Sequence, residues 1–271
     1  MIKKLFLPMP GSKQHIVRRL IELIPPHNAY VEVFGGGATL LLQKPPSPAE
    51  IYNDIDGDLV NLFRVIQDEE KFKRFYHKVY WTLYARDEYD RAMEILNNGT
   101  GDEVDRAWAL LVAIRQSFAG MKNTWGFGTA DSITPPWTNI TSLLLEIHKR
   151  IKPILIEHDD FRNIIARYDR PDTFFYLDPP YYPSTCMEMA DIYSTEMSRE
   201  DYRDLFYMLK ALKGKALLSG YNHPIYKVLE DAGWRRVDFP TKAYIPNIRM
   251  IRGRPIRVES VWFNYEPEGD D

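Results

Sequence analysis

The chain has 271 residues, of which 45% are hydrophobic and 27% charged, so disorder over most of its length is excluded. Its formal net charge of −3 excludes a uniformly basic nucleic-acid binder, although it leaves room for a local basic face. The single cysteine, Cys186, excludes an intrachain disulfide and a multi-cysteine metal site, and it favours a reducing compartment. No apolar window is long enough for a transmembrane helix, and the N-terminal apolar run is too short for a signal peptide.

Hydrophobic periodicity predicts alternating helices and strands at the start of the chain. The predicted elements are a helix over residues 13–24, a strand over 29–34, a helix over 38–42, a strand over 50–52 and a helix over 57–67. Residues 69–150 differ, because they show helical patterns and no convincing strand. A loop rich in Gly, Thr, Pro and Trp spans residues 120–137.

The alternation of strands and helices resumes after this region. The predicted strands are 154–157, 173–177, 215–219, 234–239 and 258–265, with helices over 199–212 and 224–232. The pattern predicts an α/β fold, with a mixed, mostly parallel seven-stranded sheet and helices on both faces. We therefore expect a main domain of residues 1–68 and 151–271, interrupted by a helical insertion over residues 69–150.

Two motifs near the N-terminus are candidate ligand contacts. Gly35, Gly36 and Gly37 join a predicted strand to a predicted helix, at the sheet edge where α/β proteins bind ligands. Neither the G-x-G-x-x-G pattern nor a P-loop is present, so a tight strand–helix turn is the alternative. Asp54 follows the next strand and is placed to accept hydrogen bonds from ribose hydroxyls, whereas Asp56 can cap the helix that follows.

The strongest pattern is Asp178-Pro179-Pro180-Tyr181, directly after the predicted strand 173–177. Proline has a fixed φ and no N–H, so the Pro179 carbonyl and the Asp178 carboxylate can form two adjacent acceptors. Two acceptors suit a planar amino group with two N–H donors, and Tyr181 can stack on the ring that carries it. The alternative is a cis-proline turn with a capping aspartate.

The Asp-Pro-Pro-Tyr motif, combined with the Phe34–Gly37 loop and their order in the chain, resembles Dam-like adenine-specific DNA methyltransferases. The resemblance implies a Rossmann-like methyltransferase fold, S-adenosylmethionine as cofactor, S-adenosylhomocysteine as product and no metal. It implies the catalytic residues Asp178, Pro179, Pro180 and Tyr181. The implied cofactor-binding residues are Pro10, Gly11, Ser12, Lys13, Glu32, Phe34, Gly35, Gly36, Gly37, Asp54, Ile55, Asp160, Phe161 and Asp178.

The resemblance also implies that residues 69–150 recognise the DNA target. The segment from Arg115 to Asn123 resembles the family's recognition segment, which implies DNA contacts by Arg115, Phe118, Met121 and Lys122. Core packing is the alternative for Phe118 and Met121. A second candidate lies in residues 235–257, which carry seven Lys or Arg and one acid. In it, Arg249, Arg252 and Arg254 are predicted phosphate contacts, with a solvated face as the alternative.

The predicted activity is site-specific methylation of adenine N6, with the base flipped out of duplex DNA. The alternatives are methylation of cytosine N4, methylation of a glutamine or RNA amine, and a non-catalytic DNA-binding relative of the fold. The predicted partner is double-stranded DNA rather than a membrane, and a cognate restriction endonuclease is a further candidate. We expect a monomer or weak dimer in the cytoplasm of a bacterial, archaeal or phage-infected cell. Residues 182–198 are expected to form a mobile loop that orders over the substrate.

Overall fold

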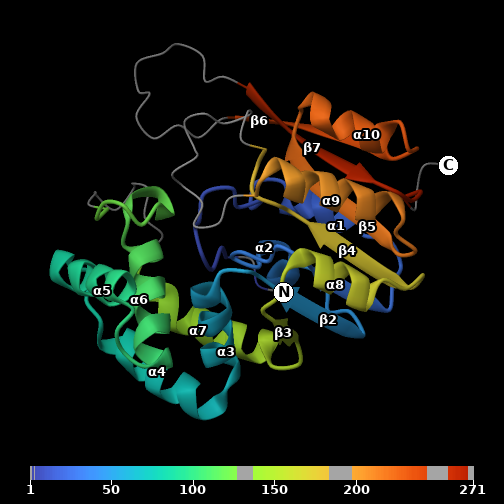
Figure 1. The fold of residues 1–271 in the computed structure, drawn as a ribbon. Helices are drawn as coiled ribbons and strands as arrows, with labels where there is room; N and C mark the ends of the chain where they lie inside the picture. The colour runs from blue at the N-terminus through green and yellow to red at the C-terminus, as the bar shows by residue number, and fades with distance from the viewer. Residues whose placement is uncertain (1, 3, 127–136, 183–196, 243–255, 268–271) are drawn as a thin grey trace. The chain divides into compact units, whose positions relative to one another are not determined.

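The computed structural model describes residues 2, 4–126, 137–182, 197–242 and 256–267 (Figure 1). The chain forms two compact units. Unit 1 comprises Met1–Gln14, Gly36–Pro45 and Asp56–His158, and unit 2 comprises His15–Gly35, Pro46–Ile55 and Asp159–Asp271. Unit 1 therefore contains the whole predicted insertion together with parts of the sequence on both sides of it. The functional boundaries at residues 69 and 150 remain a prediction.

Seven strands form a sheet in the order β3-β2-β1-β4-β5-β7-β6. They are β1 (Ala29–Glu32), β2 (Ala49–Asn53), β3 (Leu155–Glu157), β4 (Thr173–Leu177), β5 (Lys215–Tyr221), β6 (Arg235–Lys242) and β7 (Ile256–Phe263). Strand β1 is parallel to β2 and β4, and β4 is parallel to β5, whereas β7 is antiparallel to β5 and β6. The predicted mixed, mostly parallel seven-stranded sheet is confirmed.

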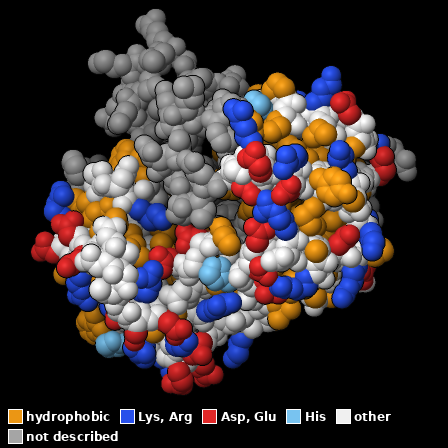
Figure 2. Space-filling view, viewed as in Figure 1, with side chains coloured by type: hydrophobic (Ala, Val, Ile, Leu, Met, Phe, Trp, Pro, Cys, Tyr) orange, Lys and Arg blue, Asp and Glu red, His pale blue; other side chains and the backbone are white. Residues whose placement is uncertain are grey.

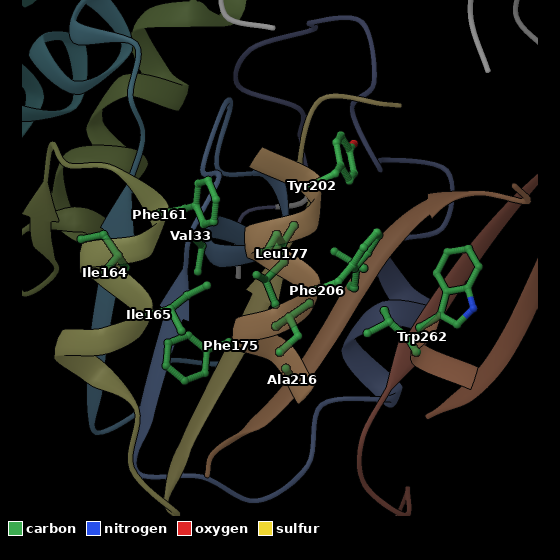
Figure 3. Packing of buried hydrophobic residues seen from close by; sticks show 14 of the residues in the cluster. Val33, Phe161, Ile164, Ile165, Phe175, Leu177, Tyr202, Phe206, Ala216 and Trp262 are labelled. Atoms are coloured by element: carbon green, nitrogen blue, oxygen red, sulfur yellow. The ribbon is translucent and has the colours of Figure 1, made fainter. Parts of the chain in front are cut away.

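The main apolar core of unit 2 lies on one face of its sheet (Figure 3). Side chains alternate along a strand, so Val31 of β1 and Val33 just after it share this face, as do Phe175 and Leu177 of β4. Helices α8 (Phe161–Tyr168), α9 (Arg199–Lys210) and α10 (Lys227–Glu230), with the turn η4 (Pro224–Tyr226), supply the other side of the core. Helix α1 (Val17–Glu22) lies on the opposite side of the sheet (Figure 1), so helices cover both faces as predicted.

Unit 1 consists mainly of helices around α6 (Glu103–Arg115). The others are α2 (Thr39–Gln43), α3 (Gly57–Gln67), α4 (Glu69–Trp81), α5 (Arg86–Asn98) and α7 (Ile140–Ile151), with the short turns η1 (Phe118–Gly120) and η2 (Trp137–Asn139). Asp102 and Asp105 form a capping box that starts α6, and every residue from Ala107 to Arg115 is buried. Because α6 is buried on all sides from Ala107 onward, α3, α4 and α5 can all pack against it. The predicted helical character of this region is confirmed.

The described residues can be searched for membrane-spanning helices and for metal-binding clusters. Within the described ranges, each helix is too short or too polar to cross a lipid bilayer. The same ranges contain no group of three or more His, Cys, Asp or Glu side chains that could hold a metal ion.

Candidate functional site

The carboxyl ends of β1, β2 and β4 lie level with one another in unit 2. Strand register pairs Glu32, the last residue of β1, with Tyr52 of β2 and with Tyr176 of β4. The glycine turn, the ribose segment and the Asp-Pro-Pro-Tyr turn each follow one of these strand ends. The structure thus brings the unit 2 parts of all three predicted motifs to the edge where α/β sheets bind ligands.

Gly35 makes the first turn after β1 and lies against β2. A Cβ atom at this position would be 2.2 Å from the Tyr52 ring, so no larger residue fits. The Gly35 N–H donates a hydrogen bond to the carbonyl of Asn53 at 2.7 Å. The predicted glycines are divided between the units, since Gly36 and Gly37 belong to unit 1.

The start of α8 brings together residues predicted for the cofactor. Asp160 caps the helix by accepting a hydrogen bond from the Arg162 N–H at 2.8 Å, and its carboxylate is 3.0 Å from the Arg162 guanidinium. The same guanidinium lies over the Phe161 ring, 4.4 Å from its centroid. The Phe161 ring in turn lies 5.6 Å from the Phe34 ring, centroid to centroid. Arg162 therefore holds the acid beside this aromatic pair.

Of the residues that directly follow β2, Asp54 and Ile55 are candidate cofactor contacts and Asp56 is a helix cap. Asp54 is half-buried, and Ile55 is an apolar side chain with 49% of its surface exposed. Asp56 accepts hydrogen bonds from the N–H groups of Asp58 and Leu59 and so starts α3. The capping role predicted for Asp56 is confirmed.

The Asp-Pro-Pro-Tyr turn leaves the buried strand β4 through trans peptide bonds, so the alternative of a cis-proline turn is wrong. Tyr202 of α9 donates a hydrogen bond from its hydroxyl to the carbonyl of Pro180. This bond engages the Pro180 carbonyl rather than that of Pro179, the carbonyl that the sequence predicts as a substrate acceptor. Helix α9 therefore fixes the turn without using the predicted acceptor.

Tyr181 is held at its hydroxyl and at one face of its ring. The hydroxyl lies 3.2 Å and 3.3 Å from the two carboxylate oxygens of Glu259 on β7. The ring stacks on Tyr221 of β5, with centroids 4.1 Å apart and planes inclined by 26°. Tyr221 and Glu259 are paired across β5 and β7, so two adjacent strands fix one aromatic ring. Any base that stacks on Tyr181 must use its other face.

Buried carboxylates concentrate negative charge beside this turn. Glu32 is only 2% exposed and Glu259 only 4%, and the Tyr30 hydroxyl donates a hydrogen bond to Glu32 at 2.8 Å. Burial, followed by the negative charges of Asp178, Glu32 and Glu259, raises the pKa of Tyr176 well above its usual value. The strand ends therefore produce a negative potential, which favours a cationic ligand.

The predicted Pro10–Lys13 segment belongs to unit 1. Lys13 is 3% exposed, and its ammonium group donates a hydrogen bond to the Gly11 carbonyl at 2.9 Å. Gly37 of the glycine turn lies against Leu7, just before this segment. Unit 1 thus contains a second group of predicted cofactor residues.

Arg115 is placed differently from the prediction. Its side chain is 3% exposed and donates hydrogen bonds to the carbonyls of Leu5 at 3.3 Å and Phe6 at 2.6 Å. Burial lowers the pKa of its guanidinium to about 10. We therefore correct the predicted base or phosphate contact: the side chain is directed inward and anchors the N-terminal segment.

The segment after Arg115 has a strained backbone. Ala119 and Lys122 have positive φ angles of 53° and 59°, which strain a residue with a side chain, and such strain is common at binding sites. Gly120 between them has a φ of 73°, which glycine adopts without strain. Phe118 and Met121 are half-buried, so neither belongs to the buried core of the unit. A Cβ atom on Gly120 would be 1.8 Å from the Pro8 carbonyl oxygen, so this segment lies directly against the N-terminal one.

The predicted basic stretch is described only in part. Arg249, Arg252 and Arg254 lie outside the described residues, as does most of the segment predicted to be a mobile loop. On β6, Arg235 pairs with Glu266, and Arg236 pairs with Glu230 and Asp238. On the face shown in Figure 2, Lys and Arg side chains alternate with Asp and Glu side chains. Arg235 and Arg236 are therefore both paired with acidic side chains.

The residues that contact predicted site residues without having been assigned to the site themselves include Asn53, Tyr202, Tyr221 and Glu259. For two of them the sequence could have indicated a role in the site, because Asn53 directly precedes Asp54 and Glu259 is an acid in an apolar strand. For Tyr202 and Tyr221 the sequence contains no such indication, since their contacts depend on how α9 and β5 pack in the fold.

The fold and the edge described above define a class, the Rossmann-like methyltransferases that act on a ring amine. Residues 10–239 match the model of the D12 class N6 adenine-specific DNA methyltransferase family, and the chain belongs to that family. It is also similar to the Type II methyltransferase M.MjaIII of Methanocaldococcus jannaschii. The two are 28% identical over 213 residues, which cover 66% of this chain and 70% of the relative. The predicted family and its activity, methylation of adenine in DNA, are confirmed.

Proposed function

We propose that the chain transfers a methyl group from S-adenosylmethionine to N6 of an adenine that is flipped out of duplex DNA. The observation that carries this proposal is the turn at the end of β4. The Tyr202 hydroxyl holds this turn through the Pro180 carbonyl. The Asp178 carboxylate and the Pro179 carbonyl, which directly follow the buried strand β4, are the proposed acceptors of the amino group. The N–H donors of an exocyclic amine match these two acceptors.

The residues of unit 2 fit the cofactor. A sulfonium carries a positive charge, which the buried carboxylates Glu32 and Glu259 favour. Asp54 would bind the ribose hydroxyls, and Asp160 and Phe161 would bind the adenine ring. In unit 1, Pro10–Lys13 would bind the methionyl carboxylate, with Lys13 as the cation. When bound, S-adenosylmethionine supplies an activated methyl group, so the protein has only to place and polarise the acceptor.

Asp178 and Pro179 polarise the amine in the proposed reaction. By accepting its N–H bonds, they draw the nitrogen lone pair out of conjugation with the ring and stabilise the positive charge that develops on transfer. Asp178 need not act as a strong general base before the transfer, because the amine becomes acidic only as it is methylated. Tyr181 stacks on the base with the ring face opposite Tyr221.

We further propose that residues 69–150 select the DNA sequence. The strained segment around Gly120 supports this, since it presents the half-buried Phe118 and Met121 and carries Lys122. Arg249, Arg252 and Arg254 are proposed to bind phosphates, so affinity should fall steeply with salt. The Type II name of the M. jannaschii relative makes a cognate restriction endonuclease a candidate partner, and a cytoplasmic location follows from such a role.

The variant Asp178→Asn tests the catalytic assignment, because it replaces an acceptor with a donor. We expect methyl transfer from radiolabelled S-adenosylmethionine to duplex DNA to fall roughly 100- to 1,000-fold, as when one polarising group is lost. Cofactor affinity, measured by calorimetry, should change less than threefold, roughly 0.6 kcal/mol. The control is Asp172→Asn, at the amino end of β4. Nearly normal transfer by Asp178→Asn would contradict the assignment, and nucleoside analysis of the product distinguishes adenine N6 from cytosine N4.

A further inference from the structure

Asn53 connects three separate segments at the cofactor edge of unit 2. It is the last residue of β2 and is 1% exposed. Its side-chain Nδ2 donates hydrogen bonds to the carbonyls of Val33 at 2.9 Å and Asp159 at 3.1 Å, and its Oδ1 accepts one from the Asp159 N–H at 2.9 Å. Its backbone carbonyl accepts a hydrogen bond from the Gly35 N–H.

Each segment joined by this amide continues directly into a residue assigned to the cofactor. The adjacent pairs are Val33 and Phe34, Asn53 and Asp54, and Asp159 and Asp160. An asparagine amide supplies two donors and an acceptor from one planar group, which neither aspartate nor serine can do. The three bonds of Asn53 use all of these functions.

The linkage extends into α8 through Asp159. One Asp159 carboxylate oxygen accepts hydrogen bonds from the Asp160 N–H at 2.8 Å and the Asn163 amide at 2.7 Å. The other oxygen is 2.8 Å from the Arg167 guanidinium. A displacement of Asn53 would therefore be passed to the first turn of α8, where Asp160 lies.

We propose that Asn53 is a positioning residue of the cofactor site. It fixes the segments that carry Phe34, Asp54 and Asp160 before the cofactor arrives, and so reduces the entropy lost on binding. The inference rests on the proposed function, because these segments form one site only if S-adenosylmethionine binds there.

Asn264 provides a matched control at the opposite edge of the same sheet. Its Oδ1 accepts a hydrogen bond from the Ala216 N–H at 2.8 Å, and its Nδ2 donates one to the Gly214 carbonyl at 3.0 Å. These contacts flank the start of β5, away from the strand ends that carry the site. The amide thus ties backbone segments as Asn53 does, at a place with no assigned ligand contact.

The test compares Asn53→Ser with Asn264→Ser in the full chain, by calorimetric titration with S-adenosylmethionine. Losing the buried amide bonds should raise the Kd of Asn53→Ser about tenfold and leave that of Asn264→Ser within about twofold of wild type. The kcat at saturating cofactor should stay close to wild type in both, and thermal unfolding should show similar losses of stability.

Unchanged affinity in Asn53→Ser, or an equal loss in both variants, would overturn the positioning role. A wild-type chain that does not bind S-adenosylmethionine would instead overturn the proposed function. If Asn53→Ser does not fold, the isosteric pair Asn53→Asp and Asn264→Asp decides by the same criterion, since both lose the amide donor and keep an acceptor.

Discussion

Two irregular regions of this methyltransferase are fixed by opposite means. In unit 2, the side chain of Asn53 ties the strand ends to α8 through hydrogen bonds. In unit 1, the N-terminal segment is fixed by a missing side chain, at Gly120, and by the buried guanidinium of Arg115. Hydrogen bonds tolerate small shifts of their partners, whereas two backbones in contact leave no room for an added atom. We therefore expect unit 1 to respond to substitution mainly in stability and unit 2 mainly in function.

The largest effect is expected for Gly120→Ala. The new Cβ would lie 1.8 Å from the Pro8 carbonyl oxygen and would need a positive φ of 73°, so we expect a loss of about 3–5 kcal/mol in stability. The control, Gly233→Ala, has a similar φ of 89° with nothing within 4 Å, so only backbone strain of about 1–2 kcal/mol applies. Chemical denaturation measures both. Equal losses would show that the close approach is not what constrains this segment.

The next largest effect is expected for Arg115→Met, which leaves the Leu5 and Phe6 carbonyls without their buried donor. We expect a loss of about 2–3 kcal/mol in the free energy of unfolding, partly recovered in Arg115→Lys. The same denaturation experiment applies. A variant of normal stability that binds DNA more weakly would restore the original prediction of a base or phosphate contact.

In unit 2, Tyr221→Leu should remove the support behind Tyr181 and lower kcat about two- to tenfold, the usual range for one aromatic pair. The KM for S-adenosylmethionine should not change, since Tyr221 supports Tyr181, a residue assigned to the target base. The control is Tyr207→Leu, because Tyr207 on α9 is 74% exposed. A change in KM alone would place Tyr221 in the cofactor site instead.

The smallest effect concerns acid stability. Arg162 on α8, through its hydrogen bond to Asp201, holds the pKa of that carboxyl below 3.8. A lowered carboxyl pKa stabilises the fold above that value, and the stabilisation is lost as the pH falls through the folded pKa. Because both side chains are about one-third exposed, we expect under about 1 kcal/mol between wild type and Arg162→Met at pH 7. Urea denaturation at several pH values should show this difference shrinking below pH 3.8, and a constant difference would rule out the ion pair as its cause.

The sheet could be predicted because its strands carry a local signal. Thr173–Leu177 is a run of five buried residues between polar segments, and its bounds were predicted as observed. The bounds of helix α8 were not predicted, because the helix is short and its buried residues are only Phe161, Ile164 and Ile165. The division into units was also beyond the sequence, since it depends on long-range contacts such as that of Arg115 with Phe6.

Candidate site residues could be predicted where a reactive or polar side chain directly follows a predicted strand. Asp178 and Asp54 follow strands whose carboxyl ends converge in any parallel sheet, so their proximity follows from topology. The buried position of Arg115 could not be predicted. A charged side chain is expected at the surface, unless one knows the carbonyl groups whose hydrogen bonds compensate the free-energy cost of burying it. The contact of Glu259 with Tyr181 likewise needs the antiparallel pairing of β7 with β5.

Strand β6 lies at an edge of the sheet, where backbone groups could pair with a strand of another molecule. Arg235, Arg236 and Asp238 place charges along this strand, and Pro240 removes a backbone donor. Growth of the sheet from copy to copy at this edge is therefore opposed by charge and by proline. Strand β6 thus completes the sheet, and its sequence disfavours aggregation through the same edge.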